Sequence, residues 1–167
     1  MSKPTLSIVI PTYNEKDNIF RILERLKKVL KSITYEIIFI DDNSPDGTAA
    51  VIKDRIKNSS KIHLIHRIGR KGLAGAVIEG VFAANADLVA VMDCDLQHDE
   101  TKLLDMIDLF SKNNSLDIVI GSRFTETGEI SEKAFSKMRE FGSKATTFII
   151  KKVLNIESTD PLSGFFM

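Results

Sequence analysis

Apolar residues recur along the chain in two alternating patterns. Short runs rich in β-branched residues predict strands, and longer stretches with an apolar residue every three or four positions predict helices. The predicted strands are 6–10, 36–40, 62–65, 88–92 and 117–120, and the predicted helices are 18–30, 48–56, 74–84 and about 101–110. Because strands that are apolar throughout alternate with helices, the pattern predicts an α/β fold whose mostly parallel central sheet has helices on both faces.

The length and composition fit a single domain that spans residues 1–167. Of the 167 residues, 43% are hydrophobic, which is enough for one substantial core. Lys and Arg balance Asp and Glu at 23 each, so the net charge gives no reason to expect a nucleic acid as partner. The only cysteine, Cys94, excludes an intrachain disulfide and a cysteine-based zinc site. Without a secretory leader or an apolar run of about 20 residues, the chain as given is expected to be soluble or peripheral.

Polar residues gather directly after three of the predicted strands, in the segments 11–15, 41–48 and 93–98. In open α/β sheets, ligands bind at the carboxyl ends of the strands, so we expect these segments to share one rim. Asp41 and Asp42 are adjacent carboxylates with no lysine nearby in the sequence. One of them is expected to hold a ligand, and nucleobase or ribose donors are suitable. Ser44 and Asp46 are open to two interpretations, since such residues also cap helices.

The segment 93–98 carries the residue types of a divalent metal site. Asp93 and Asp95 are two apart, so in an extended chain both carboxylates leave on the same face. Such oxygen donors suit Mg²⁺ or Mn²⁺, which takes one or two carboxylates and completes its shell with water and substrate phosphates. Gln97 adds a neutral ligand, and His98 fits a surface position and a functional position equally well. The alternative for the whole segment is a solvated acidic loop.

Basic residues and glycines precede the helix predicted at 74–84. In the stretch 67–76 they lie where free N–H groups and the helix dipole favour an anion. The stretch is not a P-loop, because the Gly-Lys-Ser/Thr order is absent, and no Gly-x-Gly-x-x-Gly follows a strand, which argues against a dinucleotide-binding domain. Helix capping or close helix packing explains Gly72 and Gly75 equally well.

Six motifs follow one another along the whole chain. They are PTYNE at 11–15, DDNSPDGT at 41–48, GLxxA at 72–76, DxDLQH at 93–98, GSR at 121–123 and DPxSGFF at 160–166. In this order they resemble the family 2 glycosyltransferases and, more narrowly, the dolichyl-phosphate mannose synthase branch of polyprenyl-phosphate glycosyltransferases. The resemblance implies a single GT-A domain, which is the Rossmann-like fold of nucleotide-diphospho-sugar transferases.

The resemblance also implies roles for individual residues. Those implied to line the nucleotide-sugar pocket are Pro11, Tyr13, Glu15, Ile40, Asp42, Asp93, Cys94 and Asp95. Those implied to hold the metal, either Mg²⁺ or Mn²⁺, are Asp93, Asp95 and Gln97, and those implied to be catalytic are Asp93, Asp95 and Arg123. Those implied to bind the acceptor phosphate are Arg123, Arg139 and Ser143. Cys94 is expected to be a packing residue between the two metal ligands.

The implied reaction is the inverting transfer of mannose from GDP-mannose to a polyprenyl phosphate of the dolichyl type. Transfer to a hydroxyl group needs a carboxylate base, whereas a lipid phosphate is already anionic at neutral pH. The protein then has to hold two negatively charged groups close together. Two alternatives stay open. One is an enzyme of the same fold that uses a UDP-sugar with undecaprenyl phosphate or a hydroxyl acceptor, and the other is a catalytically silent nucleotide-binding or membrane-adaptor domain.

The segment 130–155 is the part of the chain expected to contact a membrane. Between residues 130 and 153, six basic residues accompany two acidic ones on an amphipathic pattern, which favours a membrane surface. The alternative is a core-packing helix with a basic outer face. With a polyprenyl phosphate acceptor, the protein is expected to be cytoplasmic and peripheral at the cytoplasmic face of the membrane. Family members continue beyond the position of Met167, so the domain is expected to be truncated at its C-terminus.

Overall fold

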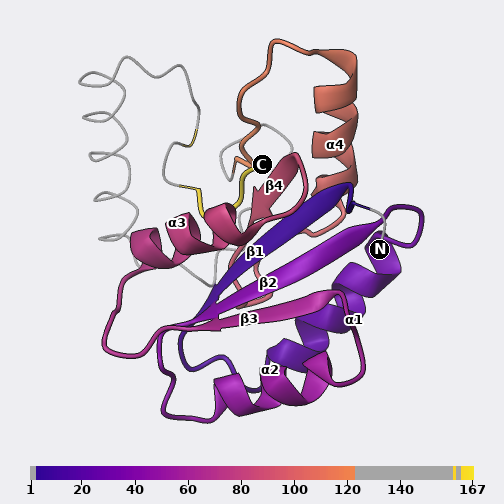
Figure 1. The fold of residues 1–167 in the computed structure, drawn as a ribbon. Helices are drawn as coiled ribbons and strands as arrows, with labels where there is room; N and C mark the ends of the chain where they lie inside the picture. Colours follow the sequence, from indigo (N-terminus) through magenta and orange to yellow (C-terminus); the bar gives the residue numbers. More distant parts are fainter. Residues whose placement is uncertain (1–2, 123–159, 161–162) are drawn as a thin grey trace, which may run out of the picture.

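The structure is a computed structural model, and it describes residues 3–122, 160 and 163–167. Four strands form one parallel sheet in the order β3-β2-β1-β4. The strands are β1 (Leu6–Thr12), β2 (Tyr35–Asp41), β3 (Ile62–His66) and β4 (Leu88–Val91), and the helices are α1 (Ile19–Val29), α2 (Thr48–Ile56), α3 (Leu73–Ala83) and α4 (Lys102–Lys112). The predicted α/β class and the parallel sheet are confirmed (Figure 1).

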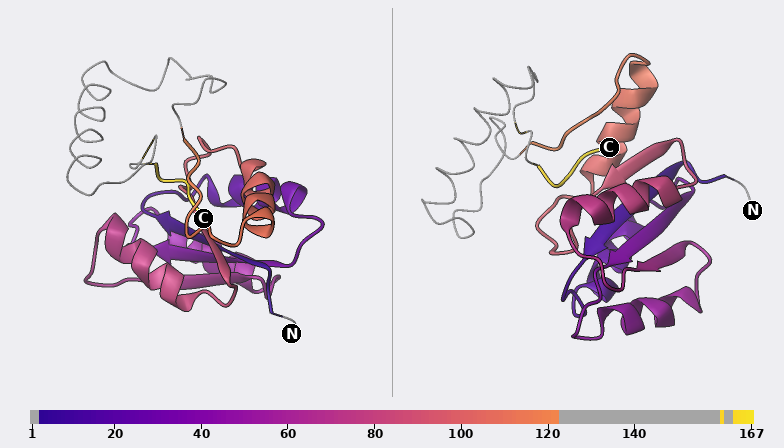
Figure 2. Two further views of the ribbon diagram at one scale, coloured as in Figure 1. Left: turned by 90° about the horizontal axis from the view of Figure 1, so that it is seen from above. Right: turned by 60° about the vertical axis from the view of Figure 1, so that its left-hand side comes forward.

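Helices cover both faces of the sheet because the strands are apolar on both sides. Helices α1, α2 and α4 lie on one face, and α3 lies on the other (Figures 1 and 2). Successive residues of β1 show the division. Ile8 and Ile10 belong to the core cluster that includes side chains of α1, α2 and α4, whereas Val9 belongs to a second cluster with Ala76 of α3. The prediction of helices on both faces is therefore confirmed.

A glycine brings α3 close to the sheet. A Cβ atom at Gly80 would collide with Val9 and would lie 2.7 Å from Cδ1 of Ile40. Without a side chain at this position, the backbone of α3 rests directly on β1 and β2.

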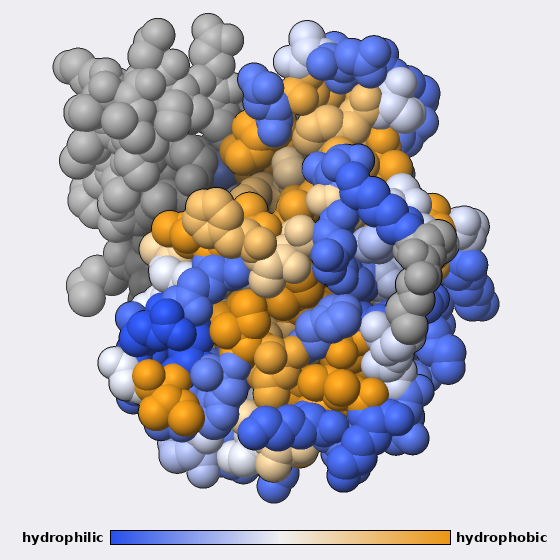
Figure 3. All heavy atoms as spheres, viewed as in Figure 1, coloured by the Kyte–Doolittle hydropathy of each residue, from blue (hydrophilic) through white to orange (hydrophobic). Residues whose placement is uncertain are grey.

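The outer surface of α3 is apolar as well. Its exposed apolar side chains include Leu73, Ile78, Val81 and Phe82, and Figure 3 shows apolar side chains gathered over this helix. Helix α3 has 11 residues, and among the described residues no helix is both long and apolar enough to cross a membrane. Helix α3 thus presents apolar side chains to the sheet and also on its outer surface.

The predicted strand 117–120 does not form a fifth parallel strand. The backbone groups of Val119 and Met167 instead exchange hydrogen bonds of 2.9 and 2.8 Å, and Phe166 bridges antiparallel to Val91 and to Ile120. The segment 163–167 therefore lies between β4 and the chain around 119–121. The prediction of a fifth parallel strand is wrong. Residues 119–120 pair with residues 166–167, which are distant in the sequence, and a local apolar pattern carries no information about such pairing.

A buried carboxylate lies at the amino end of β2. Glu36 is 5% exposed and accepts hydrogen bonds from Ser7 Oγ at 2.6 Å, from the Asn85 N–H at 2.7 Å and from Asn85 Nδ2 at 3.0 Å. Burial acts to raise the pKa of Glu36, but these hydrogen bonds and the nearby His63 together hold the pKa below its ordinary value. Because Asn85 lies two residues beyond the end of α3, this cluster fixes the carboxyl end of that helix to the sheet.

Candidate nucleotide-sugar site

The loops after β1 and β2 are joined to each other at the rim. Three backbone N–H groups of the first loop donate to side chains of the second, namely Asn14 to Ser44 at 3.0 Å, Glu15 to Thr48 at 3.0 Å and Lys16 to Asp46 at 3.1 Å. The two polar segments that follow these strands therefore share one edge, as the sequence predicts.

Asp46 and Ser44 both have structural roles. Asp46 Oδ1 accepts from the N–H and the hydroxyl of Thr48, the first residue of α2, at 3.0 and 2.6 Å. Burial acts to raise the pKa of Asp46, but its hydrogen bonds hold the pKa below the ordinary value. Ser44 accepts from the first loop and donates to Asp41 Oδ1 at 2.5 Å. Asp46 therefore accepts the N–H of the first residue of α2, although Gly47 occupies the N-cap position, whereas Ser44 joins the two loops.

The adjacent carboxylates Asp41 and Asp42 both have partners within the protein. Asp41 is fully buried and accepts from the N–H and the hydroxyl of Ser44. Asp42 Oδ1 accepts from Arg67 Nη1 at 2.6 Å, and its Oδ2 accepts from the N–H of Gly72 at 2.7 Å. The adjacency of two carboxylates therefore does not by itself require a ligand.

The arginines of the stretch 67–76 are paired with carboxylates. Arg67 is buried and donates to Asp42 and to Glu79 of α3, and Arg70 donates to the same Glu79 oxygen at 2.9 Å. Lys71 lies over the ring of Tyr13, with its Nζ 5.1 Å from the ring centre. The stretch therefore serves mainly to neutralise carboxylates, and Lys71 adds a positive charge beside an exposed aromatic ring.

The residues implied for the nucleotide pocket differ in their exposure. Tyr13 is 49% exposed at the rim, and Glu15 accepts a 2.7 Å hydrogen bond from Asn18. Pro11 is partly buried within β1. The side chain of Ile40 is fully buried against α3, which does not suit a side-chain contact with a nucleotide. Cys94 is also buried, and burial together with nearby carboxylates raises the pKa of its thiol to about 12. This burial fits a packing role.

The acidic segment after β4 bends sharply. Leu96 has a φ of 65°, which lies in the left-handed region, and Asp95 Oδ1 accepts the N–H of Gln97 at 3.0 Å. Asp95 and Gln97 are exposed, and Asp93 is partly exposed. Among the residues that the structure describes, no three His, Cys, Asp or Glu side chains gather into a metal site. Two carboxylates and an amide fit a Mg²⁺ or Mn²⁺ ion that takes its remaining ligands from water and phosphate.

His98 connects the acidic segment to the C-terminal residues. Its Nε2 lies 3.2 Å from Asp93 Oδ2, and its ring stacks on Phe165 with 5.2 Å between the centres. A Cβ atom at Gly164 would lie 2.6 Å from Asp93 Oδ2, so a larger residue at this position would require the carboxylate to shift. The histidine side chain is 15% exposed and is therefore not a free surface group. The motifs 93–98 and 163–166 form one unit around Asp93.

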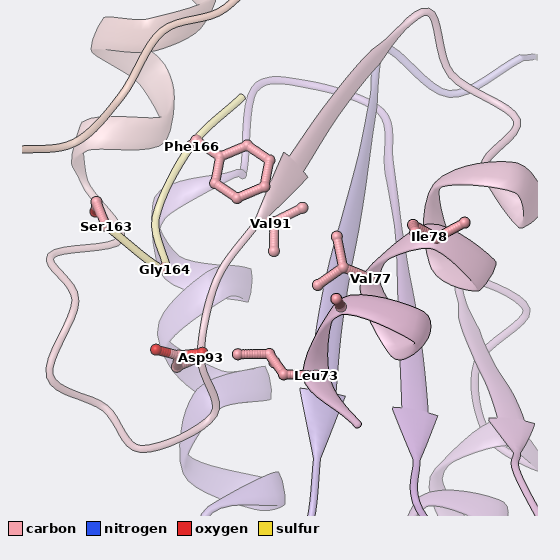
Figure 4. A pocket seen from close by; sticks show the side chains of 9 residues that line it. Leu73, Val77, Ile78, Val91, Asp93, Ser163, Gly164 and Phe166 are labelled. Atoms are coloured by element: carbon pink, nitrogen blue, oxygen red, sulfur yellow. The ribbon is translucent and has the colours of Figure 1, made fainter. Parts of the chain in front are cut away.

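A hollow of about 390 Å³ opens beside this unit, between α3, the end of β4 and the segment 163–166 (Figure 4). The residues that line it are Leu73, Ala74, Val77, Ile78, Val91, Asp93, Ser163, Gly164 and Phe166. The hollow is apolar except at the end where Asp93 and Ser163 lie.

Several implied site residues lie outside the described residues. These are Arg123, Arg139 and Ser143, which the resemblance assigns to the acceptor phosphate, and the whole segment 130–155. The sequence assigns the basic stretch 67–76 to an anion, but it does not predict that Arg67 pairs with Asp42 and Glu79.

The structure is thus an open α/β domain with a parallel sheet and polar loops at the carboxyl ends of its strands. The model of glycosyl transferase family 2 matches residues 7–167, and the chain belongs to that family. Dolichol-phosphate mannosyltransferase of Pyrococcus furiosus is 36% identical over 96% of this chain and 45% of its own length. The chain spans about half the length of the curated relatives it matches.

Two solved structures have a similar fold. A mannosyltransferase of Pyrobaculum calidifontis in complex with GDP-Man and Mn²⁺ is 21% identical, with a TM-score of 0.60 over 73% of this chain and 36% of that chain. Glucosyl-3-phosphoglycerate synthase of Mycobacterium tuberculosis in complex with uridine diphosphate is 19% identical, with a TM-score of 0.69 over 98% of this chain and 56% of that chain. The predicted GT-A fold is confirmed.

Proposed function

We propose that this chain is the donor-binding domain of an inverting glycosyltransferase that transfers mannose from GDP-mannose to a polyprenyl phosphate. The observation that carries the proposal is the meeting of two motifs at Asp93, where His98 and the backbone of Gly164 both lie against the carboxylate of the acidic loop. The relatives named dolichol-phosphate mannosyltransferase support mannose and a lipid phosphate as the substrates.

The nucleoside of the donor is assigned to the joined loops after β1 and β2. Tyr13 offers an exposed ring beside the positive charge of Lys71, which suits a nucleobase and the adjoining phosphates. Asp42 offers a fixed carboxylate at the same rim. The roles implied for Pro11 and Glu15 belong to this part of the proposal.

The diphosphate is assigned to the acidic segment after β4. Asp93, Asp95 and Gln97 would hold a divalent ion, either Mg²⁺ or Mn²⁺, which when bound would neutralise charge on the leaving diphosphate. His98 orients Asp93 from one side, and the backbone of Gly164 lies against its carboxylate on the other.

The acceptor is proposed to be its own nucleophile. A lipid phosphate is anionic at neutral pH, so it needs no base to attack the anomeric carbon. Attack opposite the departing diphosphate inverts the configuration at that carbon. Arg123, Arg139 and Ser143 are proposed to hold the acceptor phosphate and to offset its repulsion from the donor.

A membrane surface is proposed as the setting, with the basic segment 130–155 as its contact at the cytoplasmic face. Flotation of the chain with liposomes tests this part separately. Recovery should rise with anionic lipid content, and equal recovery with and without anionic lipid would contradict it.

Thermal-shift measurements with a panel of nucleotide sugars test the proposed function. With Mn²⁺ present, GDP-mannose should raise the melting temperature more than UDP-glucose or UDP-galactose does. Asp95→Ala should remove the dependence on Mn²⁺. Asp108→Ala is the matched control, because Asp108 is an exposed carboxylate on α4 that pairs with Lys112. Stabilisation by UDP-sugars alone would contradict mannose as the transferred sugar.

A further inference from the structure

Arg67 is a buried cation at the candidate donor site. Its side chain is 5% exposed. The guanidinium Nη1 donates to Asp42 Oδ1 at 2.6 Å and to the carbonyl of Gly72 at 3.1 Å, and Nε donates to Glu79 Oε1 at 3.2 Å. One side chain thus joins the end of β2, the turn before α3 and α3 itself.

The backbone of Arg67 reinforces this geometry. Its N–H donates to the carbonyl of Asp41 at 2.8 Å, which places Arg67 beside the end of β2. The side chain then reaches Asp42, the next residue of that loop. Gly72, whose φ of 123° favours glycine, donates its N–H to the other oxygen of Asp42. The carboxylate of Asp42 is therefore held from two sides.

We propose that Arg67 is a positioning residue for the donor site. It fixes the Asp42 carboxylate so that the acceptor capacity left on that group faces the nucleoside of the donor. An ionised carboxylate accepts about four hydrogen bonds, and the protein donates one to each oxygen here. The remaining capacity suits N–H groups of a nucleobase or hydroxyl groups of a ribose. The inference rests on the proposed function, which assigns Asp42 to the nucleoside.

The ion pair between Arg67 and Asp42 argues for a role beyond packing. A buried ion pair contributes little net stability, because well-packed apolar residues of similar volume often stabilise a fold equally well or better. An arginine is needed, however, where several acceptors must be held at fixed angles, because its planar guanidinium carries five donors in a rigid fork. Lysine has the same charge but lacks this geometry.

Gly75 leaves the space that the guanidinium occupies. A Cβ atom at Gly75 would lie 2.7 Å from Arg67 Nη2. Because the guanidinium is held by Asp42, Gly72 and Glu79, it has little freedom to move away. Gly75→Ala is therefore a variant that displaces the guanidinium while every charge is kept.

Isothermal titration of the 167-residue chain with GDP-mannose and Mn²⁺ tests the inference. Arg67→Lys should weaken binding about tenfold, the effect of one lost hydrogen bond between charged groups. Gly75→Ala should also weaken the binding of GDP-mannose. Arg70→Lys is the matched control, with the same substitution in the same loop, and should bind within about twofold of the wild type because the Arg70 guanidinium is 60% exposed and pairs with Glu79.

A double-mutant cycle separates positioning from a general loss of stability. If Arg67 acts through Asp42, then Asp42→Asn with Arg67→Lys should bind no more weakly than Asp42→Asn alone. A merely structural role would lower the melting temperature of the ligand-free chain and leave the affinity of the folded fraction unchanged.

The outcomes distinguish this inference from the proposed function. Wild-type affinity in Arg67→Lys would overturn the inference alone. If Arg67→Lys does not fold, wild-type affinity in Gly75→Ala would overturn it. A wild-type chain that binds no nucleotide sugar would contradict the proposed function, and the inference with it.

Discussion

Two buried carboxylates lie at opposite ends of β2, and each fixes one end of α3. Glu36, at the amino end of the strand, accepts from Ser7 and Asn85, and Asn85 follows the helix. Asp42, just beyond the carboxyl end, accepts from Arg67 and from Gly72, and Gly72 precedes the helix. The same strand and the same helix are thus joined twice.

The partners of the two carboxylates differ in a way that matches their surroundings. Three neutral donors from Ser7 and Asn85 surround Glu36 at the end of the sheet away from the acidic loop, and Nε2 of His63 lies 3.3 Å from its Oε2. At the rim, Asp42 has one charged partner and one backbone N–H, and it keeps acceptor capacity for a ligand. Both carboxylates are buried, but only Asp42 has an arginine as its partner, and Asp42 is the one that the proposed function assigns to the donor.

The largest expected loss in the free energy of unfolding follows a change at Asp42. Asp42→Ala leaves Arg67 buried without its shortest partner, and the loss of one member of a buried pair costs about 3–5 kcal/mol. Urea unfolding measures this cost. Asp54→Ala is the control, because Asp54 is an exposed carboxylate paired with Lys57 and should cost less than about 0.5 kcal/mol. Equal costs for the two variants would contradict the buried ion pair at the rim.

The second largest loss of stability is expected from a change in α3. Gly80→Ala would place a methyl group against Val9 and Ile40, and overpacking of this kind costs about 1–3 kcal/mol. Thermal unfolding should show a lower melting temperature than that of the wild type. An unchanged melting temperature would show that α3 does not rest directly on the sheet.

At the amino end of β2, Glu36→Gln should lower the free energy of unfolding by about 1–2 kcal/mol at neutral pH, because the charged acceptor is lost. Since the pKa of Glu36 in the folded protein lies below its unfolded value of about 4.3, its contribution is present above that pH and is lost as the pH falls through the folded pKa. Urea unfolding at a series of pH values should therefore show a shallower decline toward acid in the variant. Parallel declines in wild type and variant would contradict the assigned direction.

The smallest expected effect is at Arg70. Its guanidinium is 60% exposed and pairs with Glu79 at the rim, so Arg70→Gln should change the free energy of unfolding by less than about 0.5 kcal/mol. A loss comparable to that of Asp42→Ala would show that the outer part of the network, and not Arg67, holds the rim.

The sequence predicts the order of the elements and the position of the rim, because apolar runs and the polar residues that end them are local properties. The antiparallel pairing of Phe166 with Val91 was not predictable in this way, since the two residues are far apart in the chain. Ion pairing in the stretch 67–76 was missed for a similar reason. One signal was present, however, because Arg67 follows a strand directly, and a cation at that position can reach the carboxylates that follow a neighbouring parallel strand.

The assignment of the rim to a mannose donor is tested most directly by competition between two nucleotide sugars. Isothermal titration with Mn²⁺ should show one site per chain that binds GDP-mannose at least about tenfold more tightly than UDP-glucose, which corresponds to about 1.4 kcal/mol. Tighter binding of UDP-glucose, or no binding of either sugar nucleotide, would contradict the assignment.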